Sequence, residues 1–388
     1  MSEQLVPEIR VAGFDDEWIN RPFDQLVHRR SSIVTSEGLP QVEYEDIESG
    51  FGRLNRDLRT KTSHKSGIAF EPGDVVFGKL RPYLKNWLRP EFEGLAVGDF
   101  WVLVPDTCTT SFLYALIQAP RFTEASSISS GSKMPRSDWP LVSQARFAAP
   151  QNHEEHELIG GTFHRLERLI NDHRNKHRKL QQAKASLMQR MFPAPGANEP
   201  EIRFEGFSGK WEQRRLGDVA TFINGRAYSQ PELLSHGKYP VLRVGNFYTN
   251  SAWYYSDLEL NEKCYANTGD LLYTWSASFG PHIWTGGKVI FHYHIWRVEL
   301  SNALDKLFAL QLLEKHRDSI LAGHNGSTMA HITKEGMEDK SVLLAPSVAE
   351  QQAVGAFFSK LDDLIEAQAQ YVSKLQQVKA ALLQKMFI

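Results

Sequence analysis

Two stretches of the chain carry apolar residues at alternating intervals of three and four positions. The first runs from Ile159 to Met191 and the second from Val354 to Met386. This spacing places the apolar side chains on one face of a helix and is typical of a coiled-coil seam. No proline interrupts the first stretch before Pro193, so about 35 residues form a helix of roughly 52 Å. The sequence therefore predicts two long helices, each with an apolar face to cover.

The segments between these helices are patterned as short strands with occasional short helices. Runs rich in β-branched and aromatic residues, bounded by turn-forming residues, are typical of strands. We expect strands at residues 74–77, 100–104, 239–244, 270–275 and 290–298. We expect short helices around residues 112–118 and 307–316, the second ending near Gly323. The predicted fold class is therefore α+β, with two small mixed α/β domains attached to the long helices.

The chain is an internal duplication, because four separate matches share nearly the same offset. Six of eleven residues are identical in the first match, and 15 of 34 are identical in the last. The matching segments are residues 8–18 and 201–211, 73–77 and 269–273, 131–134 and 326–329, and 159–192 and 354–387. Long parts of residues 26–130 and 222–325 do not match. This pattern predicts one scaffold that presents two different surfaces.

The duplication divides the chain into four segments. They are a mixed domain at residues 1–150, a central helix at 151–193, a second mixed domain at 199–345 and a C-terminal helix at 346–388. Neither small domain can cover so long a helix alone, so we expect the two helices to pair as an antiparallel coiled coil that separates the domains. His173, His177 and Lys184 occupy positions where the seam calls for apolar residues. They indicate either a solvent-facing middle or a surface that docks onto another chain.

Composition and charge are those of a globular protein. Of 388 residues, 41% are hydrophobic and 23% are charged, and no apolar run is long enough to cross a membrane. The N-terminus lacks the pattern of a secretion signal, and two cysteines suit a reducing compartment, so we expect a cytoplasmic protein with no membrane partner. The net charge of −2 does not indicate nucleic-acid binding, but residues 51–89 hold nine Arg or Lys against three acidic residues.

Several motifs recur in the same order in both halves. The second half contains a Glu-Ile-Arg entry, a Gly-Asp strand start, a Gly-Ser turn, an Ala-Pro helix entry followed by Glu350-Gln351, and a Lys-Leu-Gln-Gln helix end. Together they resemble the specificity (S) subunit of type I DNA restriction-modification enzymes, over essentially the whole chain. The first half departs from this pattern, because one residue is inserted before the helix and the Glu-Gln pair is altered. Its mixed domain also lacks the strand signature of residues 239–244.

The resemblance implies that the two mixed domains are target-recognition domains, each reading one half of a bipartite asymmetric DNA sequence. It implies no catalytic activity and no cofactor for this chain. The implied partners are double-stranded DNA, two modification subunits that use S-adenosylmethionine, and restriction subunits that translocate and cleave DNA. The alternative is a coiled-coil scaffold that binds only protein. Divergent inserts within a matched frame favour recognition.

Residues close to the repeated turns are the candidate DNA contacts, because Lys and Arg bind phosphates while other side chains reach base edges. In the first domain they are Lys79, Arg81, Lys85, Lys133 and Arg136. In the second domain they are Arg243, Trp275, Ser276, Thr328 and His331. The ordinary alternatives are a solvated surface charge or, for the many aromatic residues of 247–296, a place in a small β-rich core.

No motif predicts catalysis or a metal site. The chain lacks the Asn/Asp-Pro-Pro-aromatic motif of a methyltransferase and the Gly-rich phosphate-binding loop of a motor. His153 and His156 are three residues apart, which does not fit the zinc motif His-Glu-x-x-His. His173 and His177 are four apart, but no third ligand lies nearby in the sequence, so we expect them to be polar seam residues.

Overall fold

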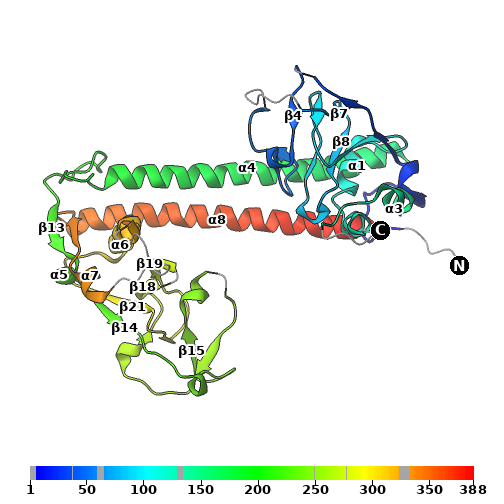
Figure 1. Ribbon diagram of the computed structural model, residues 1–388. Coiled ribbons are helices and arrows are strands. Elements are labelled where there is room, and N and C mark those ends of the chain that lie inside the picture. The colour runs from blue at the N-terminus through cyan, green and yellow to red at the C-terminus, as the bar shows by residue number, and fades with distance from the viewer. Residues whose placement is uncertain are drawn as a thin grey trace. The chain divides into compact units, whose positions relative to one another are not determined.

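Figure 1 shows the computed structural model of the chain. The structure describes residues 6–36, 38–58, 65–128, 134–248, 250–276, 278–322 and 333–388. The chain forms two compact units. Unit 1 consists of Met1–Lys176 and Gln368–Ile388, and unit 2 of His177–Ala367. The C-terminal end of the chain therefore belongs to the same unit as the N-terminal domain.

Both predicted long helices are present. α4 (His153–Met191) and α8 (Val348–Met386) contain 39 residues each, which corresponds to about 58 Å at 1.5 Å per residue. α4 gives its first part to unit 1 and its last part to unit 2, and α8 does the reverse. Neither they nor any other helix in the described part of the chain has the length and apolar character required to cross a membrane.

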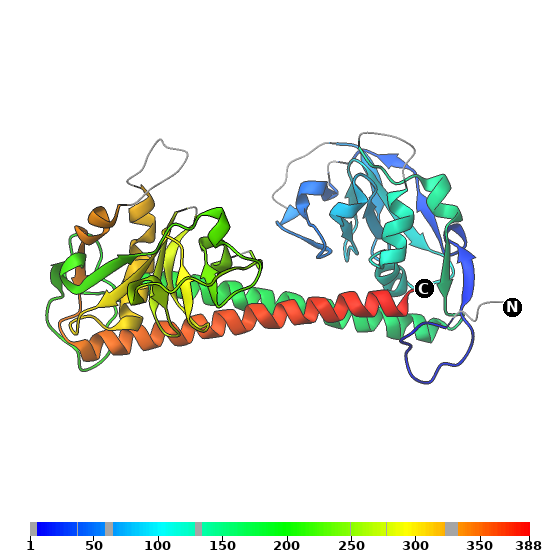
Figure 2. The same ribbon diagram turned by 90° about the horizontal axis from the view of Figure 1, so that it is seen from below.

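In unit 1 the start of α4 lies against the end of α8, so the two helices run antiparallel (Figure 2). The rings of Phe163 and Phe387 pack with their centroids 5.9 Å apart. The ammonium of Lys379 donates to Glu167 Oε1 at 2.7 Å and to Gln118 Oε1 at 2.6 Å. The second contact ties the helix pair to the mixed domain of the same unit.

Unit 2 repeats this arrangement with the other ends of the helices. The rings of Phe192 and Phe358 lie 6.2 Å apart. Lys184 Nζ donates to Asp362 Oδ1 at 2.5 Å, and Gln311 Nε2 donates to Asp362 Oδ2 at 2.9 Å. Each unit therefore contains a lysine, an acid and a glutamine that tie the helix pair to its domain. The predicted antiparallel pairing is confirmed within each unit.

The polar residues in the seam have polar partners on the facing helix. In unit 1, His173 Nδ1 lies 2.6 Å from Gln368 Nε2, and its ring lies 4.4 Å from that of Tyr371. In unit 2, Lys184 pairs with Asp362 as described above. His177 is half-buried. Because polar pairs across a helix seam favour one alignment, these partly buried contacts help to set the register of the two helices.

Unit 1 contains two four-stranded sheets. The first consists, in order, of β2 (Val27–Arg30), β11 (Phe100–Pro105), β8 (Val75–Gly78) and β9 (Trp87–Leu88), all antiparallel. The second consists of β3 (Ile33–Val34), β7 (Gly67–Phe70), β10 (Gly94–Ala96) and β4 (Gln41–Val42), with β10 parallel to β4. The rest of the unit comprises the pairs β1 (Ile19–Pro22) with β12 (Arg146–Ala149) and β5 (Ile47–Glu48) with β6 (Arg53–Leu54), and the helices α1 (Thr110–Leu116), α2 (Pro120–Ser127) and α3 (Trp139–Gln144).

The first sheet of unit 1 is buried on both faces. Val75 and Phe77 of β8 pack with α1, α2 and the ends of the long helices. Val76, between them, points to the opposite face and packs with Val42 and Phe70 of the second sheet. This arrangement explains the uninterrupted apolar run in β8, because a strand between two layers has no polar face.

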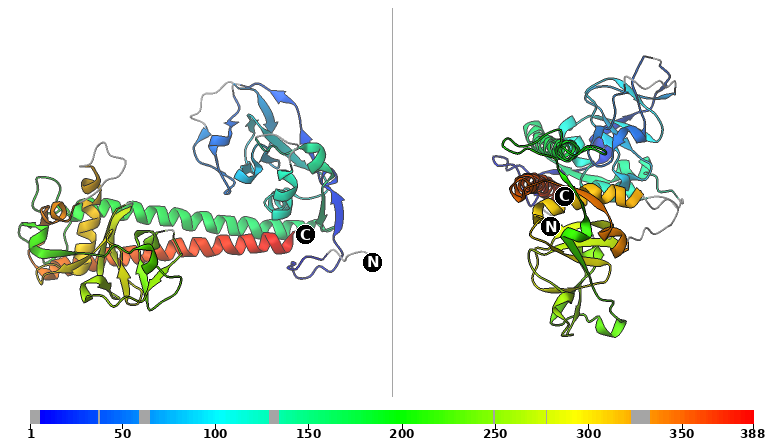
Figure 3. Two further views of the ribbon diagram at one scale, coloured as in Figure 1. Left: turned by 60° about the horizontal axis from the view of Figure 1, so that its bottom comes forward. Right: turned by 90° about the vertical axis from the view of Figure 1, so that its left-hand side faces the viewer.

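Unit 2 has the same plan (Figure 3). Its first sheet consists of β14 (Ala220–Asn224), β21 (Ile295–Leu300), β18 (Leu271–Ser276) and β19 (Ser278–Ile283). Its second sheet consists of β16 (Tyr254–Ser256), β15 (Tyr239–Leu242), β20 (Val289–Phe291) and β17 (Tyr265–Ala266). The rest comprises the pair β13 (Glu212–Arg215) with β22 (Ser341–Leu344), and the helices α5 (Leu216–Val219), α6 (Lys306–Ala322) and α7 (Lys334–Glu338). α6 packs beside β19.

The two mixed domains share more structure than their sequences indicate. The first sheets follow the same order, and each second sheet contains a strand paired parallel on one side and antiparallel on the other. The parallel partners are β4 and β10 in unit 1, and β15 and β20 in unit 2. The missing strand signature in the first domain is therefore misleading, because β4 has only two residues.

The repeated Gly-Asp pair has a structural reason in both units. Gly73 and Gly269 have φ angles of 103° and 89°, which favour glycine. In each unit the aspartate carboxylate accepts the backbone N–H three residues earlier: Asp74 from Glu71, and Asp270 from Asn267, both at 2.8 Å. The pair thus builds the tight turn that starts β8 and β18.

One predicted strand is wrong. Residues 290–298 form two strands, β20 and β21, that belong to different sheets. Between them, His292 to His294 make a turn in which Ile295 N donates to His292 O at 3.0 Å. Aromatic residues in this turn imitate a strand pattern, because aromatic side chains are common in strands.

Candidate nucleic-acid interface

The loop after β8 brings three of the predicted DNA-binding residues together. It runs from Lys79 to Asn86 and contains a short 3-10 helix, η4 (Pro82–Leu84). Arg81 precedes this helix and Lys85 follows it. Both side chains are exposed, and neither forms an ion pair within the described ranges of the chain. The loop therefore presents two available cations to solvent.

The backbone of this loop is unusual on both sides of η4. Arg81 has φ 50° and Lys85 has φ 58°, the left-handed conformation that residues other than glycine rarely adopt. Strain of this kind persists only where the surroundings hold the chain, and it is concentrated at functional sites. Here Arg81 N donates to Pro135 O, and Gly50 N donates to Lys85 O, both at 2.8 Å.

The stem of the loop is fixed by a hydrogen bond between its two ends and by Tyr44, which also bonds to Asp99. Gly78 N donates to Asn86 O at 2.7 Å and closes the loop. Tyr44 Oη accepts from Leu80 N at 3.0 Å and donates to Asp99 O at 2.6 Å. Burial raises the pKa of the Tyr44 hydroxyl well above its usual value, so it stays protonated and keeps this donor role.

Lys79 and Arg136 share one acidic partner. Arg136 Nη2 donates to Asp99 Oδ2 at 2.6 Å, and Lys79 Nζ lies 3.7 Å from Asp99 Oδ1. Leu80 and Arg136 form an isolated bridge, so the segment before α3 runs beside the stem of the loop. These two predicted contacts thus lie together, but Asp99 offsets much of their charge.

The basic stretch of residues 51–89 is less basic in three dimensions than in sequence. Several of its cations are paired with acids of residues 43–48. The pairs are Arg53 with Glu48, Arg56 with Glu45 and Asp46, and Lys65 with Glu43. Among the described residues of this stretch, the exposed cations without an acidic partner are Arg81 and Lys85 of the loop after β8.

Unit 2 places Trp275 where unit 1 has Lys79. Lys79 N donates to Asp99 O at 2.8 Å, and Trp275 N donates to His294 O at 3.1 Å. These bonds are equivalent, because both join the end of the central strand to the residue before the next strand of the sheet. The segments 73–77 and 269–273 match at an offset of 196, which also aligns position 79 with position 275, so the repeat agrees with the backbone contacts.

The side chains at the end of β18 are engaged within unit 2. Trp275 is half-buried, its Nε1 donates to Tyr293 O at 2.9 Å, and its ring stacks on Trp296 at 5.5 Å. Ser276 is buried. Trp275 thus forms part of an aromatic cluster, with the ring of His294 5.1 Å away.

Arg243 directly follows strand β15 of the second sheet of unit 2. Its guanidinium lies over the ring of Tyr254 at 4.3 Å, and its Nη2 donates to Ala252 O at 3.3 Å. Its backbone N–H donates to the side-chain oxygen of Asn246 at 3.0 Å, and this bond closes the turn after β15. The residue is half-buried, so its cation is only partly available.

Three further predicted contacts, Lys133, Thr328 and His331, lie outside the described residues. The role of every candidate as a DNA contact stays a prediction. Asp99 and Tyr44, which organise the loop, were not anticipated. Asp99 follows Gly98 directly before β11, a pattern shared by many turns, and nothing in the sequence links it to Arg136.

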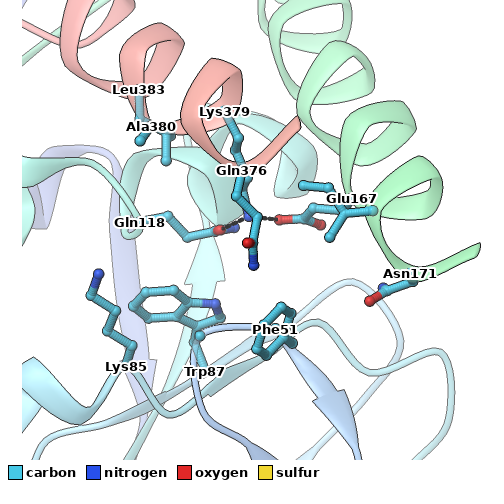
Figure 4. A pocket seen from close by; sticks show the side chains of 12 residues that line it. Phe51, Lys85, Trp87, Gln118, Glu167, Asn171, Gln376, Lys379, Ala380 and Leu383 are labelled. Carbon is cyan, nitrogen blue, oxygen red and sulfur yellow. Dashed lines mark hydrogen bonds and ion pairs between the residues drawn. The ribbon is translucent and has the colours of Figure 1, made fainter. Parts of the chain in front are cut away.

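A cavity of about 280 Å³ adjoins the loop within unit 1. Figure 4 shows Trp87 and Phe51 on one side of it, and Lys379 hydrogen-bonded to Glu167 and Gln118 on the other. Because a carboxylate matches the lysine, that wall offers no unpaired cation to a ligand. The lysine contacts join the helix pair to the domain, as described above.

The histidines that the sequence offers as possible metal ligands have other surroundings in the structure. Among the described residues, no three His, Cys, Asp or Glu side chains come together as metal ligands. His156 is buried, with its ring 4.4 Å from that of Phe112. Burial, reinforced by His153, lowers the pKa of His156 to about 4, so it is neutral at pH 7.

Comparison with known proteins identifies one domain of the chain. Residues 208–377 match the family described as the type I restriction modification DNA specificity domain. The chain is 26% identical over 180 residues to the type I restriction enzyme MjaVIII specificity subunit of Methanocaldococcus jannaschii, covering 46% of this chain and 42% of that protein. It is 24% identical over 154 residues to the EcoDI specificity subunit of Escherichia coli, covering 37% and 34%. The matched part thus spans less than half of these relatives.

Two solved structures share the fold. The S subunit of a type I restriction-modification system from M. genitalium aligns with a TM-score of 0.65 and 14% identity, covering 98% of this chain and 99% of that one. A chain from a study of the assembly and conformational transition of the type I R-M system aligns with a TM-score of 0.56 and 20% identity, covering 94% and 96%. At these identities the likeness concerns the fold, and it confirms the predicted fold class.

Each unit combines an α/β domain of the same strand order with one end of each long helix, and unit 1 displays two exposed cations on the loop after β8. The match of residues 208–377 to the type I restriction modification DNA specificity domain agrees with this fold. The resemblance stated from the repeated motifs is thereby confirmed.

Proposed function

We propose that this chain is the DNA sequence-specificity subunit of a type I restriction-modification complex and has no catalytic activity of its own. In this role it binds double-stranded DNA and recruits two modification subunits and restriction subunits. Each mixed domain reads one half of a bipartite asymmetric site. The bounds proposed for these target-recognition domains remain residues 1–150 and 199–345, and the conserved helices 151–193 and 346–388.

One observation carries this proposal. The two units share their strand order, but the matching loops at the ends of β8 and β18 differ in chemistry. Unit 1 presents the exposed Arg81 and Lys85 on the loop after β8, whereas in unit 2 β18 ends in Trp275 and Ser276, and Ser276 pairs with Ser278 of β19. A scaffold that bound only protein would have no need for unlike loops on a common frame.

The chemistry of these loops suits DNA recognition. Arg81 and Lys85 are exposed and lack an acidic partner among the described residues, so they supply charge for the phosphate backbone. Lys79 and Arg136 can join them if one of these cations exchanges its ion pair with Asp99 for a phosphate. Lys133, Thr328 and His331 remain proposed contacts of the same kind.

In unit 2 the proposed contacts are Arg243, Trp275 and Ser276. Arg243 is half-buried, with its guanidinium over the ring of Tyr254. Trp275 is held by its Nε1 bond and by its ring contacts, so its role is to shape the surface near the half-site.

A complex of this kind acts on the genome, so we propose a cytoplasmic location.

Methylome sequencing tests the proposal. A host that carries this gene is compared with a deletion strain and with the deletion strain complemented by the gene. We expect a bipartite methylated motif that disappears on deletion and returns on complementation. A methylome that does not depend on the gene would contradict the proposal and favour the protein-binding scaffold.

A further inference from the structure

The loop after β8 displays two large apolar side chains at its tip. Tyr83 and Leu84, both in η4, are 52% and 41% exposed. They lie between the exposed cations Arg81 and Lys85, while Pro82 of the same turn is buried. Single exposed apolar residues are common on protein surfaces. An adjacent pair flanked by two cations is a more specific combination.

The display of these side chains is enforced by the structure. The residues on either side of the tip, Arg81 and Lys85, both adopt left-handed backbone conformations. Each is tied by a backbone hydrogen bond to a different segment, Arg81 N to Pro135 O and Gly50 N to Lys85 O. A loop free to relax would adopt ordinary φ angles. The two bonds hold the backbone of the tip in the conformation that leaves Tyr83 and Leu84 exposed.

The combination fits the groove of a DNA duplex. A surface that contacts DNA needs cations at phosphates and apolar or hydrogen-bonding groups at base edges. Apolar side chains contact the 5-methyl group of thymine in the major groove, and an aromatic hydroxyl can also hydrogen-bond a base edge. The tip carries an aromatic ring with a hydroxyl and an aliphatic side chain, and the cations stand beside them.

We propose that Tyr83 and Leu84 contact base edges and determine specificity at the half-site read by unit 1, while Arg81 and Lys85 bind the flanking phosphates. This inference rests on the proposed function and assigns its base-reading residues in unit 1. At the matching place in unit 2, the described residues Trp275, Ser276 and Ser278 include no pair of exposed apolar side chains, and Ser276 of β18 pairs with Ser278 of β19. The two half-sites are therefore read by different chemistry.

Equilibrium DNA binding of the full chain, assembled with its modification subunits, tests the inference. Tyr83→Ala/Leu84→Ala is compared with Arg81→Ala/Lys85→Ala, on duplexes with the intact site and with the first half-site scrambled, over a series of salt concentrations. Leu141→Ala serves as the matched control, because Leu141 is also an exposed apolar residue of unit 1, at 46%.

We expect Tyr83→Ala/Leu84→Ala to lower the preference for the intact site on the order of tenfold. The dependence of its affinity on salt should stay that of the wild type, because no phosphate contact is lost. The Leu141 control should bind as the wild type does. If the wild-type complex discriminates between the duplexes and the tip variant discriminates equally well, the inference is wrong. If the wild-type complex itself does not discriminate, the proposed function fails instead.

Discussion

Replacing Glu350 by glutamine tests the contact that joins the entry segment of unit 2 to α8. The Glu350 carboxylate is 1% exposed and accepts two hydrogen bonds from Arg203, Nε at 2.8 Å and Nη2 at 2.7 Å. It also accepts from Trp211 Nε1 at 3.2 Å. Glutamine keeps the shape of the side chain but has no charge, and its amide NH₂ would face the guanidinium donors.

The expected loss of stability follows from burial. Removing one partner of a buried ion pair typically destabilises a protein by about 3–5 kcal/mol. The Arg203 side chain is only 16% exposed, but it also donates to Gly209 O at 2.7 Å and to Ser208 O at 3.0 Å. These bonds partly compensate the guanidinium, so we expect about 3 kcal/mol. For a unit of this size that lowers the melting temperature by roughly 6–12 °C.

Differential scanning calorimetry of the purified chain measures this effect. Glu155→Gln makes the same change in unit 1, where Arg10 and Trp18 hold the carboxylate in the same way. Glu201→Gln is the control, because that carboxylate pairs with Arg190 on the surface. We expect no measurable shift for the control. A Glu350→Gln melting temperature within 1 °C of the wild type would refute the view that this buried pair stabilises unit 2.

Three further changes test other contacts. Arg81→Ala/Lys85→Ala should lower the affinity of the assembled complex for specific and non-specific DNA alike, and it should reduce the slope of log K against log salt concentration by about 2. An unchanged slope in a salt titration would show that neither residue contacts phosphates. Lys379→Met leaves the Glu167 carboxylate without its cation, so urea unfolding should show a loss of about 2 kcal/mol in unit 1; an unchanged midpoint would contradict this. His156 has a folded pKa of about 4, below its unfolded value, so its contribution is complete at pH 7 and is lost as the pH falls from about 6.5 towards 4. His156→Gln should therefore lose less thermal stability than the wild type between pH 7 and pH 5, and equal losses would show that His156 does not contribute.

The fold could be predicted to a large extent because its frame is encoded twice. The long helices follow from the spacing of apolar residues, and their antiparallel pairing follows from the need to cover both seams. The second copy of each motif shows that the first is not accidental: Gly73-Asp74 and Gly269-Asp270 build the same turn. Strand β4 was missed because two residues carry too little pattern.

The candidate interface could be predicted only in part. The sequence places Lys79, Arg81 and Lys85 in one loop, because they are neighbours in the chain. It does not show that Asp99 pairs with Lys79 and Arg136, since that depends on how separate segments meet. Nor could it predict the left-handed backbone of Arg81 and Lys85, because no residue type there favours positive φ.

The contacts repeated in both units explain how the two recognition surfaces can differ. Each unit joins an entry arginine and tryptophan to a buried glutamate at the start of a long helix. Each also joins a lysine, an acid and a glutamine between the helix pair and the domain. These polar contacts join the domains to the long helices. The loop after β8 and the β18–β19 turn, by contrast, lie at the ends of the central strands.

Because the frame obtains its stability from the buried strands and from these repeated contacts, residues at the loop ends are free to change without unfolding the unit. That separation accounts for the pattern in the sequence, in which turns and helices match between the halves while the segments between them do not. It also explains why strain is tolerated at Arg81 and Lys85: the surrounding frame is stable enough to hold a loop in a conformation that the loop alone would not adopt.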